Sequence, residues 1–152
     1  TFERKQKAKT AGLSEVEVIT LASIVDEETD NEAEMPKVAG MYINRLHLNM
    51  PLQADPTIKF ATRNFTAHRI YQKWLTVDSP YNTYKYRGLP PGPIRIPSIA
   101  AINAVLNYVH HDYIYMCAKE DFSGTHNFAK TYEEHQVNAA KYAKALNEHG
   151  IN

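Results

Sequence analysis

The sequence predicts an α+β domain in which helices pack around a small β-hairpin, with a long loop-rich central segment that forms a groove. Two helical patterns occupy residues 14–47, a proline-rich stretch fills residues 49–97, and a helix, a hairpin and a helix follow. With 152 residues the chain is long enough for one domain that buries its own core. We therefore expect a single domain over residues 1–152.

The first helix is expected over residues 14–29. Ser14 stands at its N-cap position, and Glu17, three residues later, completes a capping box. A second helix is expected over residues 36–47, because Pro36 suits a first helical turn and apolar residues recur after it at helical spacing. The polar face of this helix is expected to contain Lys37, Asn44 and Arg45.

The central segment, residues 49–97, contains every proline of the chain except Pro36. Frequent prolines interrupt regular helices and strands, so we expect ordered loops built around short elements. Loops of this length are uncommon in compact domains and are often functional. The segment is therefore interpreted as one wall of a binding groove.

The last third of the chain is expected to contain a helix over residues 98–106, a hairpin over 113–129 and a helix over 131–146. Ser98 is a suitable N-cap for the first of these. Strand-forming residues fill 113–118, and turn residues follow at 121–124. Thr131 and Glu134 form a second capping box, which starts the final helix.

Composition excludes several classes of function. Lysine plus arginine equal aspartate plus glutamate at 17 each, which argues against nucleic acid or an anionic membrane surface as a partner of this domain. The sequence contains no metalloprotease helix motif, phosphate loop, nucleophile elbow or dinucleotide fingerprint, so no metal and no cofactor are expected. The single cysteine, Cys117, cannot form an intrachain disulfide.

The densest cluster of carboxylates is Asp26, Glu27 and Glu28, at the end of the first predicted helix. At about 100° per residue, Glu28 continues the apolar stripe of Leu21 and Val25, whereas Asp26 points roughly opposite. Apolar neighbours and the negative end of the helix dipole disfavour the charged form of Glu28, as a general acid requires. Acidic helix ends are more often solvated surface, so the pattern needs independent support.

Residues 21–29 resemble the catalytic motif of the YceG-like family of endolytic murein transglycosylases. The resemblance continues in the family's order through residues 38–46, 52–57, 81–94 and 124–135, and so covers nearly the whole chain from about Gly12. One departure is Asp26, where the family commonly has glutamate.

The resemblance implies that Glu28 is the single catalytic acid and base of a lytic transglycosylase. Such an enzyme cleaves the MurNAc–GlcNAc bond of nascent peptidoglycan strands, leaves a 1,6-anhydro-MurNAc end, and is expected to terminate glycan elongation. Glu28 would protonate the leaving oxygen and then remove the proton from the C6 hydroxyl that closes onto C1. Because the substrate supplies the nucleophile, one carboxylate suffices, whereas most glycoside hydrolases need two.

The resemblance also implies a place in the cell envelope, at the outer face of the inner membrane. Family members have a transmembrane helix and a LysM-like domain before the catalytic domain, and neither is found in this sequence. We expect residues 1–152 to be the catalytic domain alone. Peptidoglycan strands are the expected partner, and peptidoglycan synthases are further candidates.

Polar residues of the matched segments are the candidates for binding the sugar, since amides, hydroxyls and imidazoles hydrogen-bond hydroxyl and N-acetyl groups. They are Gln53, Asp55, Asn82, Tyr84, His126 and Asn127. Each has a structural alternative, for example a turn fixed by Asp55 or Asn82. Two other functions stay open: a muramidase that uses water with Asp55 or Asp26 as second carboxylate, and a silent glycan-binding or scaffold domain.

Overall fold

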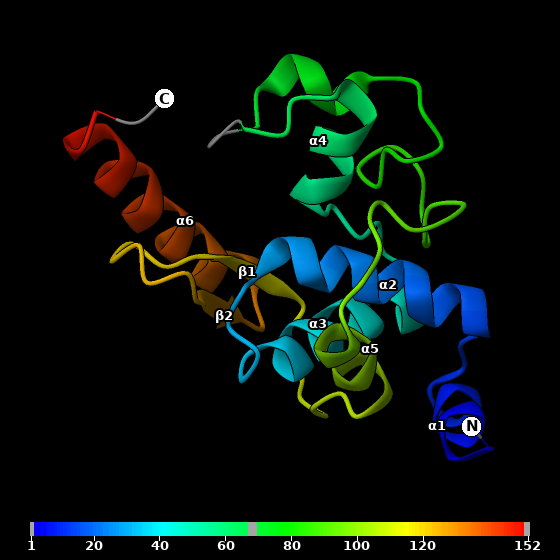
Figure 1. Ribbon diagram of the computed structural model, residues 1–152. Coiled ribbons are helices and arrows are strands. Elements are labelled where there is room, and N and C mark those ends of the chain that lie inside the picture. The colour runs from blue at the N-terminus through cyan, green and yellow to red at the C-terminus, as the bar shows by residue number, and fades with distance from the viewer. Residues whose placement is uncertain (1, 67–69, 151–152) are drawn as a thin grey trace.

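The computed structural model describes residues 2–66 and 70–150, and in that part of the chain a helical core lies beside a two-stranded sheet (Figure 1). The elements are α1 (Phe2–Ala11), α2 (Glu15–Glu28), α3 (Met35–His47), α4 (Asp55–Thr62), the 3-10 helix η1 (Gln72–Thr76), α5 (Ile99–Leu106), β1 (Tyr115–Ala118), β2 (His126–Ala129) and α6 (Tyr132–Glu148). The predicted α+β class is confirmed. The four helices expected from the sequence are present as α2, α3, α5 and α6.

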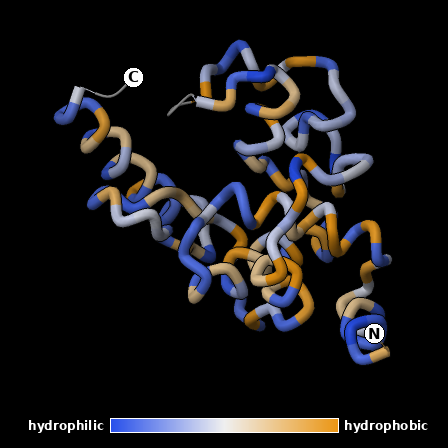
Figure 2. The backbone as a smooth tube through the Cα atoms, viewed as in Figure 1, coloured by the Kyte–Doolittle hydropathy of each residue, from blue (hydrophilic) through white to orange (hydrophobic). Residues whose placement is uncertain are grey.

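The core of the domain lies between α2, α3 and α5, where the hydrophobic colour concentrates in Figure 2. Helix α2 begins at the predicted capping box, in which Ser14 accepts from the backbone of Glu17 and Glu17 accepts from that of Ser14. Its residues 20–26 form an unbroken buried run. A helical segment that is apolar on most sides must be covered by other elements, and residues 20–26 are covered in this way.

The sequence pattern placed Asp26 roughly opposite Glu28 on α2, and it did not indicate what Asp26 contacts. Its carboxylate is buried, and Oδ2 accepts the backbone N–H of Ser98 at 2.6 Å, just before α5. Nearby, Ile94 donates its N–H to Ser23 Oγ at 3.0 Å. The segment that leads into α5 thus covers α2 at Ser23 and Asp26.

Two residues of the predicted polar face of α3, Asn44 and Arg45, are packed against other parts of the chain. Arg45 is buried and donates to the carbonyl oxygens of Ile114 at 2.6 Å and Pro51 at 2.8 Å. Asn44 donates to the carbonyl oxygen of Tyr113 at 2.9 Å. Backbone carbonyls that are removed from water need hydrogen-bond donors, and Asn44 and Arg45 supply them to residues 113 and 114. These bonds hold the connection before β1 against α3.

Strands β1 and β2 pair antiparallel, with Tyr115 opposite Ala129 and Ala118 opposite His126. Helix α6 packs on both strands, and the hairpin with α6 lies beside the helical core rather than at its centre (Figure 1). Met116 and Phe128 pack against the core and fasten the hairpin to it.

The central segment is organised by α4, η1 and ordered turns, as its prolines indicate. In Figure 1 it lies on the opposite side of the molecule from α6. No helix within residues 2–66 and 70–150 combines the length and the apolar character that a bilayer span requires.

Candidate active site

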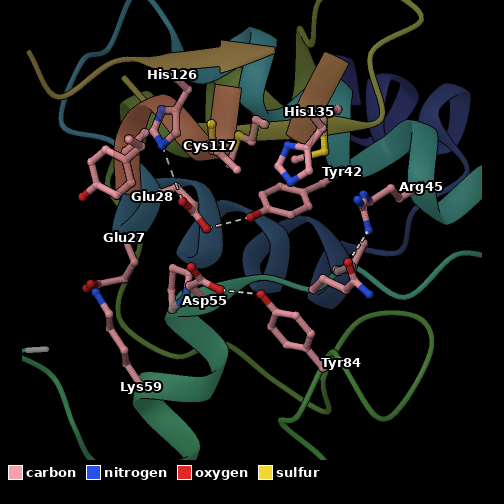
Figure 3. A pocket seen from close by; sticks show the side chains of 18 residues that line it. Glu27, Glu28, Tyr42, Arg45, Asp55, Lys59, Tyr84, Cys117, His126 and His135 are labelled. Atoms are coloured by element: carbon pink, nitrogen blue, oxygen red, sulfur yellow. Dashed lines mark hydrogen bonds and ion pairs between the residues drawn. The ribbon is translucent and has the colours of Figure 1, made fainter. Parts of the chain in front are cut away.

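A cavity of about 380 Å³ opens between the central segment and the hairpin, above the C-terminal end of α2 (Figure 3). One wall, which we call the loop wall, consists of residues 52–59 and Tyr84. The opposite wall, the hairpin wall, consists of β1, β2 and α6. Glu28 of α2 and Tyr42 of α3 lie between the walls (Figure 3). Segments distant in sequence therefore meet at one concave site.

Glu28 is the last residue of α2, and its side chain is 13% exposed. The hydroxyl of Tyr42 donates to its Oε1 at 2.7 Å. Burial, and then the charge of Glu28, hold the pKa of Tyr42 well above its usual value, so this phenol stays protonated and remains a donor. The remaining exposed part of the carboxyl faces the cavity, where a ligand can reach it (Figure 3).

His126, the first residue of β2, lies between two carboxylates. Its Nε2 is 3.7 Å from Oε2 of Glu28, and its Nδ1 is 2.9 Å from Oε2 of Glu34. Burial by itself lowers the pKa of His126, but the carboxylates of Glu28 and Glu34 outweigh burial and raise that pKa to about 9. The imidazole is therefore a cation at neutral pH, with an N–H on each ring nitrogen.

On the loop wall, Asp55 begins α4 and accepts a hydrogen bond of 2.5 Å from the hydroxyl of Tyr84. The carboxyl is open to the cavity but lies deep between its walls. This loss of hydration, followed by the charge of Glu28, raises the pKa of Asp55 to about 6, although Tyr84 and Lys59 act in the opposite direction. The charge of Glu28 thus acts on Asp55 across the cavity.

Gln53 also lines the cavity and has a backbone φ of 50°, in the left-handed region that a residue other than glycine rarely adopts. Its N–H donates to the carbonyl oxygen of Thr83 at 3.2 Å, and its Oε1 accepts from Arg45 at 3.5 Å. These contacts hold the backbone in its unusual conformation at the edge of the site.

Two of the predicted sugar-binding residues do not face the cavity. Asn82 is 0% exposed, and its amide donates to the carbonyl oxygens of Leu75 and Val77 while its Oδ1 accepts from the backbone of Tyr84. It fixes the loop that presents Tyr84, and its groups are fully used. Asn127 follows His126 on the strand, so it points to the opposite face, where its amide donates to Glu120 at 2.9 Å.

The structure also brings in residues that the sequence did not single out for the site. Tyr42 and Glu34 contact Glu28 and His126, but each contact joins different elements, so no local pattern reveals it. On α6, His135 and Tyr142 both line the cavity. They are seven positions apart, which places them on one helix face, and this spacing is a signal that sequence inspection can use.

The site is suited to proton transfer. Glu28 can give a proton to a ligand in the cavity, and Tyr42 and His126 can then stabilise the resulting carboxylate. Among residues 2–66 and 70–150, no three or more histidine, cysteine, aspartate or glutamate side chains are grouped as metal ligands.

Comparisons with known proteins agree on one family. The family model described as YceG-like matches residues 1–141. An endolytic murein transglycosylase of Bacillus subtilis (strain 168) is 39% identical over 144 residues, which cover 95% of this chain and 39% of that protein. An endolytic murein transglycosylase of Streptococcus pneumoniae serotype 2 (strain D39 / NCTC 7466) is 33% identical over 141 residues, which cover 90% of this chain and 25% of that protein.

The same family is found among solved structures. A crystal structure of a yceG-like protein from Listeria monocytogenes superposes with a TM-score of 0.78 at 35% sequence identity, over 88% of this chain and 43% of that chain. The chain therefore spans less than half the length of each of these relatives.

Proposed function

Because this chain belongs to the YceG-like family, we propose that it is the catalytic domain of an endolytic lytic transglycosylase. Its substrate would be the glycan strand of nascent peptidoglycan, cleaved between MurNAc and GlcNAc. The observation that supports this proposal most directly is the place of Glu28, whose carboxyl faces the cavity while Tyr42 and His126 lie against it.

In the proposed reaction Glu28 acts twice. It first gives its proton to the glycosidic oxygen, and the bond between that oxygen and C1 of MurNAc breaks. The carboxylate then removes the proton of the C6 hydroxyl on the same sugar, whose oxygen forms a bond to C1. The leaving sugar keeps the first proton and Glu28 regains one, so the enzyme returns to its starting state.

Between these two steps Glu28 is a carboxylate, and the donors around it act at that stage. Tyr42 donates at 2.7 Å, and the protonated ring of His126 lies 3.7 Å away. Hydrogen bonds to a charged group in a partly desolvated site are stronger than those between neutral groups. Tyr42 and His126 therefore favour departure of the proton and lower the barrier to the first step.

The loop wall has a different proposed role. Asp55, held by Tyr84, faces the cavity across from Glu28. A carboxylate in that position can accept hydrogen bonds from sugar hydroxyl or N-acetyl groups, or stabilise positive charge that develops near C1. With a pKa of about 6, Asp55 is mostly ionised at neutral pH.

We extend the proposal to the protein's setting. The curated relatives are named endolytic murein transglycosylases, and murein is a polymer of the cell wall. We place the activity at the cell envelope, outside the inner membrane, with peptidoglycan strands as the partner and peptidoglycan synthases as candidate neighbours. In this proposal residues 1–152 act as a single catalytic unit.

The decisive experiment is mass spectrometry of the products formed from purified, un-crosslinked glycan strands. We expect the parent chain to produce 1,6-anhydro-MurNAc ends and Glu28→Gln to lose about a hundredfold or more of that activity, since the amide cannot exchange a proton. Glu32→Gln is the matched control, because Glu32 is exposed on the turn before α3 and away from the cavity.

Other products would contradict the proposal in distinct ways. Reducing ends would show that water is the nucleophile, and Asp55 would then be the second carboxylate of a muramidase. Glycan binding without cleavage would identify a silent binding domain. Loss of the native circular-dichroism spectrum in Glu28→Gln would show that Glu28 is needed for the fold instead.

A further inference from the structure

We propose that Glu34 is a positioning residue: it holds His126 in the orientation and charge state in which the ring stabilises Glu28. This inference rests on the proposed function only in so far as Glu28 is the reacting group. Glu34 stands just before α3 and is not among the residues that line the cavity. Its carboxylate contacts His126, which does line the cavity, so His126 is the residue through which this carboxylate can act on catalysis.

Both oxygens of Glu34 are used by the same residue. Oε1 accepts the backbone N–H of His126 at 2.6 Å, and Oε2 lies 2.9 Å from its Nδ1. The two side chains are 10% and 7% exposed, so solvent competes little for these bonds. A carboxylate that binds backbone and ring together fixes the strand position and the ring rotation at once. Because a carboxylate only accepts hydrogen bonds, Nδ1 must carry the hydrogen of this contact. The other ring nitrogen, Nε2, then points to Glu28.

The negative charge of Glu34 balances the positive charge of His126, and this balance affects how the pair acts on Glu28. When Glu28 holds its proton, the Glu34 carboxylate still contacts Nδ1 of His126 at 2.9 Å, so a charged ring would not lie uncompensated beside the neutral acid. Once the proton has left, the N–H on Nε2 is in place 3.7 Å from the new carboxylate. The pair thus stabilises the charged form of Glu28 without further rearrangement of the protein.

Burial alone would keep His126 neutral, since it lowers the pKa of the ring. The other titratable or charged groups that line the cavity come from every element around it: Glu27 from α2, Tyr42 and Arg45 from α3, Asp55 and Lys59 from α4, Tyr84, Cys117 from β1, and His135 and Tyr142 from α6. Tyr42 stays protonated, and burial followed by the charge of Arg45 lowers the pKa of His135, so neither balances the charge of His126. Glu34 is the carboxylate that touches His126 without taking part in the proposed proton transfers.

The test follows the ring nitrogens of His126 by NMR during a pH titration, in the parent, in Glu34→Gln and in the control Glu32→Gln. The amide oxygen introduced by Glu34→Gln would still accept from the backbone N–H of His126, so we expect the fold to persist. We expect the midpoint of His126 to lie near 9 in the parent and to fall by about one pH unit or more in Glu34→Gln. Glu32→Gln should match the parent.

Kinetics on glycan strands give a second readout. We expect kcat of Glu34→Gln to fall by about tenfold at pH 8 with little change in KM, and its alkaline limb to move to lower pH with the His126 midpoint. If Glu34→Gln fails to fold, Glu34→Asp keeps the charge at a longer distance and should lower the midpoint by a smaller amount.

An unchanged His126 midpoint in Glu34→Gln would overturn the proposal, whether or not the chain cleaves glycan. A lowered midpoint with an unaltered pH profile of kcat would also overturn it, because the charge of His126 would then be irrelevant to Glu28. Absence of cleavage by the parent would instead count against the proposed function, and the NMR titration would still decide the effect of Glu34 on His126.

Discussion

The hydroxyl of Tyr42 is the contact to Glu28 that can be removed with the least disturbance. Tyr42 is buried in the core and donates to Oε1 of Glu28 at 2.7 Å. Replacing it with phenylalanine keeps the ring, its packing and its rotamer preferences, and deletes one oxygen atom. The substitution therefore tests whether the bond stabilises the carboxylate that forms when Glu28 releases its proton.

The size of the effect follows from the surroundings of this bond. A hydrogen bond to a charged group contributes about 1.5–3 kcal/mol, and the site is poorly accessible to water that could replace it. If the bond reaches full strength only once Glu28 is charged, this difference adds to the activation barrier. We therefore expect Tyr42→Phe to reduce kcat by about 10-fold to 150-fold, with a much smaller change in KM.

The chain offers a matched control in Tyr86, whose hydroxyl also donates to a carboxylate, Asp78, at 2.7 Å. That pair is exposed and lies outside the cavity, so water can replace the bond. The assay is the initial rate of anhydro-end formation by the parent, Tyr42→Phe and Tyr86→Phe, with urea unfolding to verify the fold. Equal rates for the two variants would refute the role assigned to the Tyr42 hydroxyl.

Two further predictions concern stability. A Cβ at Gly40 would lie 2.2 Å from the backbone oxygen of Val109, so Gly40→Ala should lower the free energy of unfolding by about 1–3 kcal/mol in spite of its better helix propensity; an unchanged urea midpoint would contradict this packing. The pKa of His126, about 9 in the folded chain, exceeds the ordinary 6.5, so its pairing with Glu28 and Glu34 stabilises fully below about pH 6.5 and is lost as the pH rises through about 9. Urea unfolding should therefore show a decline on the order of 2–3 kcal/mol across that range in the parent and a smaller one in Glu34→Gln, and equal declines would contradict the prediction.

Local signals in the sequence predicted the elements that depend on local chemistry. The capping box at Ser14 starts α2 in the structure, and Pro36 lies in the first turn of α3. Thr131 caps α6 by accepting from the backbone N–H of Glu134, but the Glu134 side chain accepts from the Thr131 hydroxyl instead of its backbone N–H, so the second predicted capping box is only half formed. Helix α1 was not predicted from the sequence. It is polar and buries only Ala8 and Ala11, so its sequence lacks the apolar residues at helical spacing that indicate a helix.

The candidate site was predicted in part, for a related reason. Glu28 and four of the six sugar-binding candidates line the cavity, but Asn82 and Asn127 do not. An asparagine that closes a turn has the same local pattern as one that binds a sugar, and only burial separates the two. The contacts of Glu34 with His126 arise from tertiary packing, which periodicity does not reveal.

The cavity is lined partly by the helical core and partly by two walls, and these parts differ in how freely they can change during evolution. Glu28 and Tyr42 lie on helices that form the core, whereas Asp55 and His135 lie on the loop wall and the hairpin wall. Changes in the loop wall or on α6 that leave Asp55 and His126 in place can reshape the groove, while α2, α3 and β2 still hold Glu28, Tyr42 and His126. Under the proposed function, such changes would alter which glycan strands the groove accepts without altering the residues that transfer the proton.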